Sequence, residues 1–210
     1  MEESVVPDLI LASASPRRRE LLVGLGLNFE IQPSTVTEPP HQGEDPGEYA
    51  AQLAKAKALS VAAGRQRGLI IGADTVVVLA GRVLGKPGDE EEAHKMLSQL
   101  SGRSHTVYTG VAVVNAATGE SLVETVATKV FFRRLSQEEI AAYVASGEPL
   151  DKAGAYGIQG LGALLVERIE GCYFNVVGLP LSALDRLLRR FGFAILQKER
   201  MENKRTKYKI

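Results

Sequence analysis

The sequence predicts an α/β or α+β fold with a mixed β-sheet flanked by helices. Segments with the apolar spacing of helices alternate with short apolar runs of strand type along most of the 210 residues. In the middle of the chain, two long runs rich in Val and Thr, residues 104–115 and 122–133, predict a long β-hairpin. Because alternating helices and strands favour parallel pairs and a hairpin is antiparallel, we expect one sheet that contains both.

Composition limits the classes of protein to consider. The chain is 45% hydrophobic and 24% charged, as in ordinary globular proteins. Lys and Arg number 25, as do Asp and Glu, so no overall basic field exists and we expect no nucleic-acid partner. The single Cys172 excludes an internal disulfide framework and fits a reducing compartment, so we expect a cytoplasmic protein. No signal-peptide pattern and no run of about 18 apolar residues is present, so we expect no membrane contact.

The first strand and helix carry the most unusual charge pattern. Residues 9–12 form an apolar run, and Ser15 followed by Pro16 predicts the start of a helix. The next three residues, 17–19, are all Arg, although the first turn of a helix disfavours cations. An anion in front of this helix would explain them, held by backbone N–H groups, hydroxyls and guanidinium groups. A solvated basic turn, or a basic targeting run, is the alternative.

A strand at residues 29–32 and a long polar loop at 33–47 come next, followed by a helix from Pro46 to about residue 63. An apolar face runs along this helix at 3.6-residue spacing. Lys57 lies at the edge of that face, whereas Lys55 points to the opposite side. Lys57 is therefore better placed to reach a site beside the core.

Asp74 interrupts the most apolar segment of the chain. Residues 68–79 predict a buried strand that continues into a hairpin at Ala80-Gly81. An unpaired carboxylate in such a strand would be costly, so we expect a cation or several hydrogen-bond donors beside it. A functional carboxylate in a cleft and a structural Asp that holds backbone amides both fit this pattern.

The second half of the chain predicts further alternation. Residues 85–88 form a turn without Walker spacing, and capping residues predict helices from Asp89 to about residue 100 and from Ser136 to 146. Residues 147–160 contain four Gly and predict an extended loop at which backbone approaches a ligand. We expect a hairpin from residues 163–169 and 173–177, and a last helix from Pro180 to about 190. The domain is expected to span residues 1–193, with 194–210 as a flexible basic tail.

In order along the chain, the motifs resemble one known family, the Maf-like nucleoside triphosphate pyrophosphatases. The matching segments are residues 13–18, Glu38, Lys57, and residues 72–75, 85–87, 101–105, 151–160 and 175–180. Each segment alone is weak, but together they cover residues 8–193 at the spacing of the family.

This resemblance implies a fold similar to that of inosine triphosphatase, with an elongated mixed sheet and a cleft between two lobes. It implies hydrolysis of a nucleoside triphosphate to the monophosphate and pyrophosphate with Mg²⁺ or Mn²⁺. Arg17, residues 73–75 and residues 157–160 are similar to those of the subgroup acting on dTTP and UTP. Members of the family are often dimers, which leaves a homodimer open.

The roles of the residues follow from this resemblance and from the chemistry of a polyphosphate. We expect a cation set of Arg17, Arg18, Lys57 and Lys86, with Ser13 and Ser15 on phosphate oxygens. Asp74 and Glu38 are the expected metal ligands, and the resemblance assigns Asp74 as the residue that activates water. Whether Asp74 acts directly or through the metal stays open. Thr75, Gln159 and Arg17 are expected to set base preference, since a Gln amide both donates to and accepts from a uracil edge.

Other functions remain as alternatives. The same chemistry with another base preference, such as 7-methyl-GTP, would keep the motifs of the phosphate site. A regulatory module that binds nucleotide but turns it over slowly would keep the pocket, although the intact Asp74 and Glu38 argue against it. Binding of nucleic acid through Arg17–Arg19 and the tail is disfavoured by the zero net charge.

Overall fold

The computed structural model describes residues 8–196 of the chain. Its strands are β1 (Leu9–Leu11), β2 (Glu30–Ile31), β3 (Leu69–Leu79), β4 (Arg82–Leu84), β5 (Ser104–Asn115), β6 (Ser121–Phe132) and β7 (Val166–Glu170). Its α-helices are α1 (Pro16–Gly24), α2 (Pro46–Ala62), α3 (Glu90–Leu100), α4 (Gln137–Ala145), α5 (Tyr173–Val177) and α6 (Leu181–Arg190). Short 3-10 turns, η1 (Glu148–Asp151), η2 (Ala153–Ala155) and η3 (Gly160–Leu165), lie between α4 and β7.

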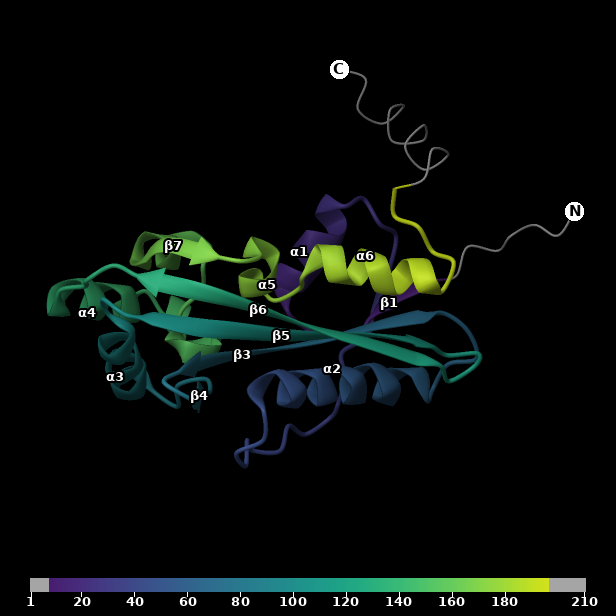
Figure 1. The fold of residues 1–210 in the computed structure, drawn as a ribbon, viewed down its shortest axis with the longest axis horizontal. Helices are drawn as coiled ribbons and strands as arrows, with labels where there is room; N and C mark the ends of the chain where they lie inside the picture. Colours follow the sequence, from purple (N-terminus) through teal and green to yellow (C-terminus); the bar gives the residue numbers. More distant parts are fainter. Residues whose placement is uncertain (1–7, 197–210) are drawn as a thin grey trace, which may run out of the picture.

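The strands of the described chain form one mixed sheet in the order β2-β1-β3-β5-β6-β7, with β4 paired to β3 (Figure 1). β1 runs parallel to both β2 and β3. β3, β5, β6 and β7 follow one another in antiparallel pairs. The β5–β6 hairpin is the one expected from the Val- and Thr-rich runs. The predictions of a mixed sheet and of this central hairpin are confirmed.

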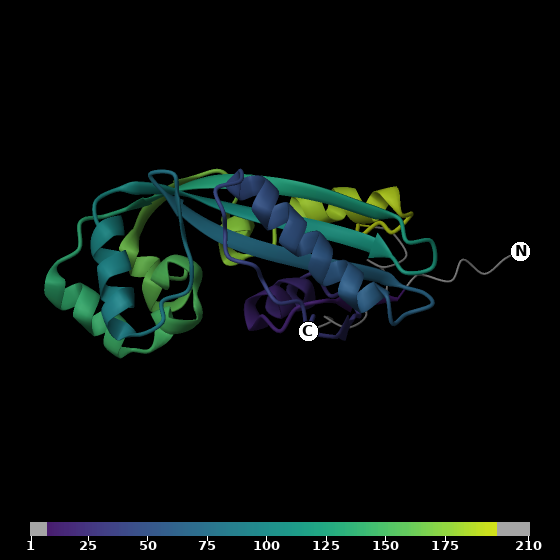
Figure 2. The same cartoon turned by 90° about the horizontal axis from the view of Figure 1, so that it is seen from below.

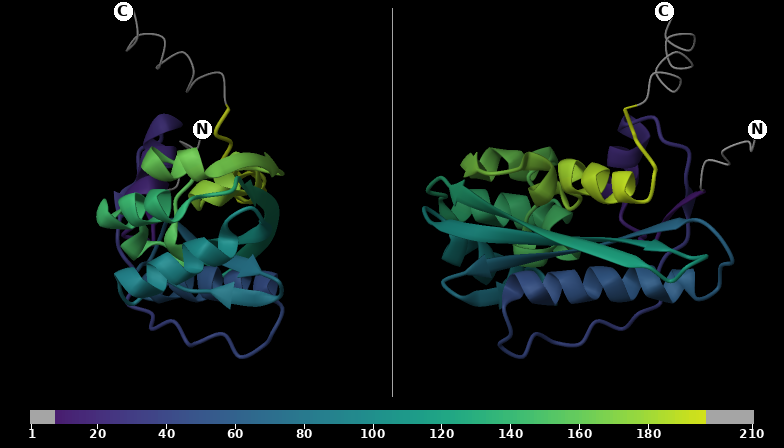
Figure 3. Two further views of the ribbon diagram at one scale, coloured as in Figure 1. Left: turned by 90° about the vertical axis from the view of Figure 1, so that its left-hand side faces the viewer. Right: turned by 45° about the vertical axis from the view of Figure 1, so that its right-hand side comes forward.

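Helices cover both faces of the sheet: α2 lies along one face, and α1, α5 and α6 lie on the other (Figures 1 and 3). Two glycines, Gly72 in β3 and Gly110 in β5, face α2. A side-chain carbon built on Gly72 would lie 2.2 Å from the carbonyl oxygen of Ala54, and one on Gly110 would lie 2.4 Å from that of Ala50. Any larger residue would push the helix away, so these glycines let the backbone of α2 rest directly on the sheet.

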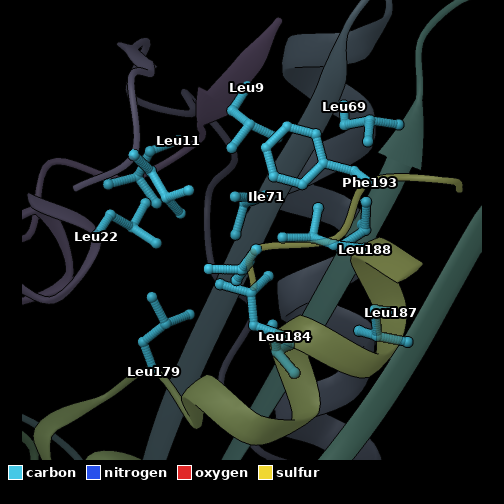
Figure 4. Close-up of a cluster of buried hydrophobic side chains, with 14 of the residues drawn as sticks. Leu9, Leu11, Leu22, Leu69, Ile71, Leu179, Leu184, Leu187, Leu188 and Phe193 are labelled. Atoms are coloured by element: carbon cyan, nitrogen blue, oxygen red, sulfur yellow. The ribbon is translucent and has the colours of Figure 1, made fainter. Parts of the chain in front are cut away.

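Aliphatic side chains fill the core on the side of α1 and α6 (Figure 4). Alternate residues of β1 and β3, among them Leu9, Leu11 and Ile71, point toward this side. They meet Leu184 and Leu187 from α6. Each fully buried side chain of this size contributes about 1.5–3 kcal/mol to the free energy of unfolding. The first strand is therefore held by helix α6, from the other end of the chain.

A second lobe lies at the far end of the sheet, built from α3, α4 and the 3-10 turns (Figure 2). Its core contains edge-to-face aromatic contacts around Phe132, whose ring centroid lies 4.7 Å from that of Tyr156 and 5.1 Å from that of His105. The Tyr156 hydroxyl and Nε2 of His105 share a hydrogen bond of 2.7 Å. The two-lobed, elongated α/β architecture that the resemblance implied is confirmed.

The expected second hairpin is wrong in one half. Residues 166–170 do form β7, paired with β6, but residues 173–177 form the short helix α5. The run Tyr-Phe-Asn-Val-Val has the residue types of a strand, but Asn175 donates its side-chain amide to Val107 O and Thr128 Oγ1. These contacts with distant strands favour a helical turn, which ends at Gly178 in the left-handed region. The loop expected at 147–160 contains η1 and η2.

The end of the described chain packs against the main core. Ile195 is buried in the same cluster as Phe193 and Leu188. The expected basic tail lies mostly outside the described residues, since 197–210 are beyond them. None of the helices formed within residues 8–196 is long and apolar enough to cross a membrane.

Candidate active site

A cavity of about 690 Å³ lies at an interruption in the pairing along one edge of β3. On this edge β1 pairs with residues 69–71 and β4 with residues 77–79, and neither strand pairs with residues 72–76. Successive side chains of a strand point to opposite faces of the sheet. Because no strand covers this edge at residues 72–76, side chains from both faces can reach the cavity there. Asp74 and Thr75 therefore reach the same cavity from opposite sides of the sheet.

Asp74 meets its expected cation there. Nζ of Lys57 lies 2.6 Å from Oδ1 of Asp74 and 2.5 Å from Oε1 of Glu38. The side chains of Lys57 and Asp74 are only 13% and 9% exposed. Lys57 is on α2, and Gly72 lets the backbone of this helix lie directly against β3, so the ammonium is held close above the strand. Lys55, expected on the other side of the helix, is exposed.

The environment moves the pKa values of the two carboxyl groups in opposite directions. Burial raises the pKa of Asp74, and the nearby Lys57 and Arg18 offset only part of that rise. For Glu38 burial acts in the same direction, but the hydrogen bond from Lys57 and the charge of Lys86 outweigh it, so its pKa is lowered. The ammonium of Lys57 thus contacts two different carboxylates, a more basic one on Asp74 and a less basic one on Glu38.

Arg18 closes the site from the other face of the sheet. Its Nε donates to the carbonyl of Gly178 at 2.8 Å, and its terminal nitrogens donate to Ser13 Oγ and Thr75 Oγ1, both at 3.2 Å. Burial lowers the pKa of Arg18, while the charge of Asp74 acts to raise it. The guanidinium remains the charged form at neutral pH, because arginine is protonated throughout the ordinary range. It connects α1 to the segment after β1, to β3 and to the end of α5.

The start of α1 explains the three consecutive arginines. Ser15 caps the helix by accepting from the backbone N–H of Arg18, and Pro16 occupies the first helical position, as expected. Arg17 and Arg18 line the cavity, whereas Arg19 is exposed. Nη2 of Arg17 lies 3.9 Å from Oδ2 of Asp151, across from the second lobe. Arg17 and Arg18 therefore face one cavity. This arrangement fits an anion site better than it fits the alternative of a solvated basic turn.

The remaining predicted residues divide into two groups. Lys86, in the turn after β4, lines the cavity. So do four further predicted residues from other parts of the chain: Ser13, Ser15, Glu38 and Thr75. Gln159 is half-buried in the second lobe and is not part of the cavity lining. One cavity thus brings together Arg17, Arg18 and Asp74, whereas the roles assigned to single residues stay predictions.

Sequence reasoning gave no role to three further residues that line the cavity, Asp151, Lys152 and Tyr156. Nζ of Lys152 lies 2.6 Å from Oδ1 of Asp151 and adds a cation to the expected set. All three belong to the segment 147–160, whose four glycines predict a loop close to a ligand. That composition is the signal in the sequence that could have identified them as site residues.

The collection of side chains fits a polyphosphate. Five cations, Arg17, Arg18, Lys57, Lys86 and Lys152, line one cavity together with the N-terminus of α1. Glu38 and Asp74 supply oxygen ligands, but no group of three or more His, Cys, Asp or Glu side chains gathers within residues 8–196. A divalent cation here would thus take at most part of its ligands from these groups and would need oxygens from a substrate or water.

The chain is similar to several known proteins. A protein named dTTP/UTP pyrophosphatase from Moorella thermoacetica is 60% identical over 184 residues, covering 88% of this chain and 95% of its own length. One of the same name from Pelotomaculum thermopropionicum is 54% identical over 189 residues, covering 90% of this chain and 99% of its own. Among solved structures, a HAM1 protein from Coxiella burnetii aligns with a TM-score of 0.42 at 19% identity, over 71% of this chain and 86% of that one.

A family match spans nearly all of the described residues. The family described as "Maf-like protein" matches residues 8–191, from the start of β1 to the end of α6. This range includes every residue that lines the cavity. The chain belongs to the Maf-like protein family.

Proposed function

We propose that this protein hydrolyses dTTP and UTP between the α- and β-phosphates, releasing the nucleoside monophosphate and pyrophosphate. The observation that carries the proposal is a buried carboxylate, Asp74, raised in pKa and set in a cavity lined by five cations. The names and high identities of the relatives support the choice of dTTP and UTP. Cytoplasmic location, a homodimer, the absence of a nucleic-acid partner and the domain limits at residue 193 stay predictions.

Neutralisation of charge is the first task of the site. A nucleoside triphosphate carries about four negative charges, and transfer of a phosphoryl group depends on positioning and electrostatics. The guanidinium groups of Arg17 and Arg18 suit paired contacts with phosphate oxygens, whereas Lys57, Lys86 and Lys152 act as point charges. The free N–H groups at the start of α1 and the hydroxyls of Ser13 and Ser15 add donors.

Asp74 supplies the base. Burial raises its pKa, which makes the carboxylate a better proton acceptor, and the charge of Lys57 opposes this rise by favouring the ionised form. The attacking water gives its proton to an Asp74 oxygen while its own oxygen bonds to the α-phosphorus. The α–β bridging oxygen leaves with pyrophosphate. Lys86 and Lys152 also line the cavity, where their charges would stabilise the leaving pyrophosphate.

Glu38 and Asp74 fit a divalent cation such as Mg²⁺ or Mn²⁺. Both carboxylates contact the same ammonium of Lys57 and line the same cavity, so these two residues would hold such a cation. Mg²⁺ is commonly bound by one or two carboxylates together with substrate phosphates. When bound, such a metal supplies charge neutralisation at the phosphates and a more acidic water.

Selection of the base is assigned to Thr75, Arg17 and Gln159. The Thr75 hydroxyl is already engaged, since Oγ1 contacts both Arg18 and Oγ1 of Thr109 at 2.9 Å. Gln159 lies outside the cavity lining, so its assignment rests on the chemistry of its amide, which can pair with the carbonyls and N–H of a uracil edge. Substitution of Gln159 by Ala is expected to weaken the preference for UTP over GTP, and an unchanged preference would remove this residue from the assignment.

A panel of nucleoside triphosphates tests the whole proposal. The wild-type protein is assayed at neutral pH with and without Mg²⁺, and monophosphate, diphosphate and pyrophosphate are separated and measured. We expect monophosphate and pyrophosphate, with dTTP and UTP as the best substrates. Diphosphate and inorganic phosphate as products would contradict the proposed bond. Preference for 7-methyl-GTP would support the alternative base, and tight binding without turnover would support a regulatory module.

A further inference from the structure

The segment from Gly157 to Gly162 forms a small closed loop at the cavity end of the second lobe. Its two ends touch, because a side-chain carbon built on Gly162 would lie 2.1 Å from the carbonyl oxygen of Gly157. Gly160 has a φ of +64°, which favours glycine at that turn. Gln159, the residue assigned to base selection, lies in the middle of this loop.

One carboxylate holds the far end of the loop. Glu148 accepts the backbone N–H of Leu161 at 3.0 Å on Oε2 and that of Gly162 at 3.1 Å on Oε1. The same Oε1 accepts the hydroxyl of Tyr143 at 2.9 Å. A half-buried carboxylate that receives three hydrogen bonds fixes the position of its donors more firmly than any single neutral contact would.

Tyr143 extends this contact to the near end of the loop. Its hydroxyl accepts the backbone N–H of Gly157 at 3.3 Å while it donates to Glu148. Burial, followed by the proximity of Glu148, raises the pKa of Tyr143, so the hydroxyl keeps its proton and remains a donor. Glu148 and Tyr143 thus form a clamp that holds both ends of one loop.

The near end of the loop packs against two residues that line the cavity, Arg17 and Lys152. A side-chain carbon built on Gly157 would lie 3.0 Å from Nη1 of Arg17 and 3.1 Å from Cε of Lys152. Nζ of Lys152 donates to the backbone carbonyl of Glu148. Displacement of the loop would therefore move the side chains that line the cavity, as well as Gln159.

We propose that Glu148, together with the Tyr143 hydroxyl, is a positioning residue for base discrimination, which sets the loop 157–162 against the nucleotide. This inference rests on the proposed function, because it deepens the role of the same site. Neither residue lines the cavity, so the clamp acts through the loop and has no contact with the phosphates. Its loss is expected to change which base is preferred more than it changes turnover of the best substrate.

Conservative substitutions test the clamp. Glu148→Gln keeps the size of the side chain but replaces one acceptor oxygen with a donor, and Tyr143→Phe keeps the ring and removes the hydroxyl. Glu139→Gln is the matched control, since Glu139, on α4, is likewise a carboxylate that accepts from a backbone N–H and from a side chain, here those of Ser136 and Arg133. For each protein, kcat/KM and equilibrium binding are measured for UTP, dTTP, CTP and GTP, together with Tm and hydrogen exchange of residues 157–162.

We expect the UTP-to-GTP ratio of kcat/KM to fall about tenfold in Glu148→Gln and about fivefold in Tyr143→Phe. The double variant should fall by less than the product, because both changes break one network. Exchange at 157–162 should rise in both variants and stay unchanged in Glu139→Gln.

Each other outcome has a separate meaning. A lower Tm with unchanged base ratios would overturn the inference and leave a structural role alone. A wild type that binds triphosphates with a base preference but releases no pyrophosphate would refute the proposed function, while the binding ratios would still judge the clamp. A wild type that neither binds nor hydrolyses any triphosphate would refute both.

Discussion

The two sides of the cavity are built in different ways. On the side of α2 and β3, Lys57 and Asp74 stand on long regular elements, and the elements contact each other backbone to backbone at Gly72 and Gly110. On the side of the second lobe, short 3-10 turns carry the lining, and side-chain hydrogen bonds from Glu148 and Tyr143 hold them. We call the side of α2 and β3 the rigid side and the side of the second lobe the adaptable side. Under the proposed function the base, Asp74, stands on the rigid side, whereas the residues assigned to base selection are shared, with Thr75 on β3 and Gln159 in the second lobe.

The largest effect should come from Asp74→Asn. Asn keeps the shape of the side chain but cannot accept the proton of the attacking water, so kcat should fall by about 10²- to 10⁴-fold. Binding of UTP, measured by calorimetry, should stay within about threefold. Asp45→Asn, a change at the N-cap of α2 where Asn caps equally well, is the control and should keep full activity. A rate loss of less than tenfold in Asp74→Asn would remove it from the role of base.

Lys57→Met should follow with a loss of about a hundredfold in kcat/KM, because it leaves Asp74 buried without its closest cation. Lys57 lowers the pKa of Asp74, so removing it raises that pKa further. The acidic limb of the pH profile of kcat/KM should therefore move to higher pH. Lys55→Met, on the exposed side of the same helix, should leave the profile unchanged. An unmoved limb would show that another group titrates.

His105 gives a smaller effect that concerns stability on the adaptable side. Burial lowers its pKa to about 4, whereas an unfolded His titrates near 6.5. Between these values the unfolded chain binds more protons, so the free energy of unfolding falls as pH falls, by up to about 3 kcal/mol. His105→Gln should lose this slope in urea denaturation across the same pH range. Identical slopes in both proteins would contradict a buried neutral imidazole beside Tyr156.

The smallest effect is expected for Asp151→Asn. The Asp151 side chain is 70% exposed and lies 3.9 Å from Arg17, and exposed ion pairs contribute at most about 1 kcal/mol. Removing this negative charge frees Arg17 and Lys152 for the substrate, so KM for UTP should fall by up to about threefold at low salt. The difference should vanish at high salt, because salt screens exposed charges. A large loss of activity would instead make Asp151 part of the chemistry.

The rigid side of the cavity was largely predictable from sequence. Asp74 was conspicuous because it interrupts an apolar strand, and Lys57 because it sits at the edge of a helical face. The position of the arginines at the start of a helix was predictable because Ser15 and Pro16 precede them. Each of these signals is local, since the periodicity of a helix or strand decides which way the side chain points.

The adaptable side was only partly predictable. Glu148 receives N–H groups from residues thirteen and fourteen positions further along, and no spacing rule announces such a contact. Helix α5 was expected as a strand, since its residue types favour β-structure while its conformation depends on contacts of Asn175 with β5 and β6. Gly-rich composition indicated that residues 147–160 were important, without indicating how they fold.

The interrupted edge of β3 has a consequence for how the gene can vary. Asp74 and Thr75 are adjacent, yet they point to opposite faces of the sheet. Asp74 contacts Lys57, and Thr75 contacts Arg18. Loss or gain of a single codon within this strand would turn each side chain to the other face, so the acid would meet the guanidinium of Arg18 and the hydroxyl would meet Lys57. Lineages of this protein can therefore change their chemistry here by replacing residues, while insertions and deletions should be confined to the connecting loops.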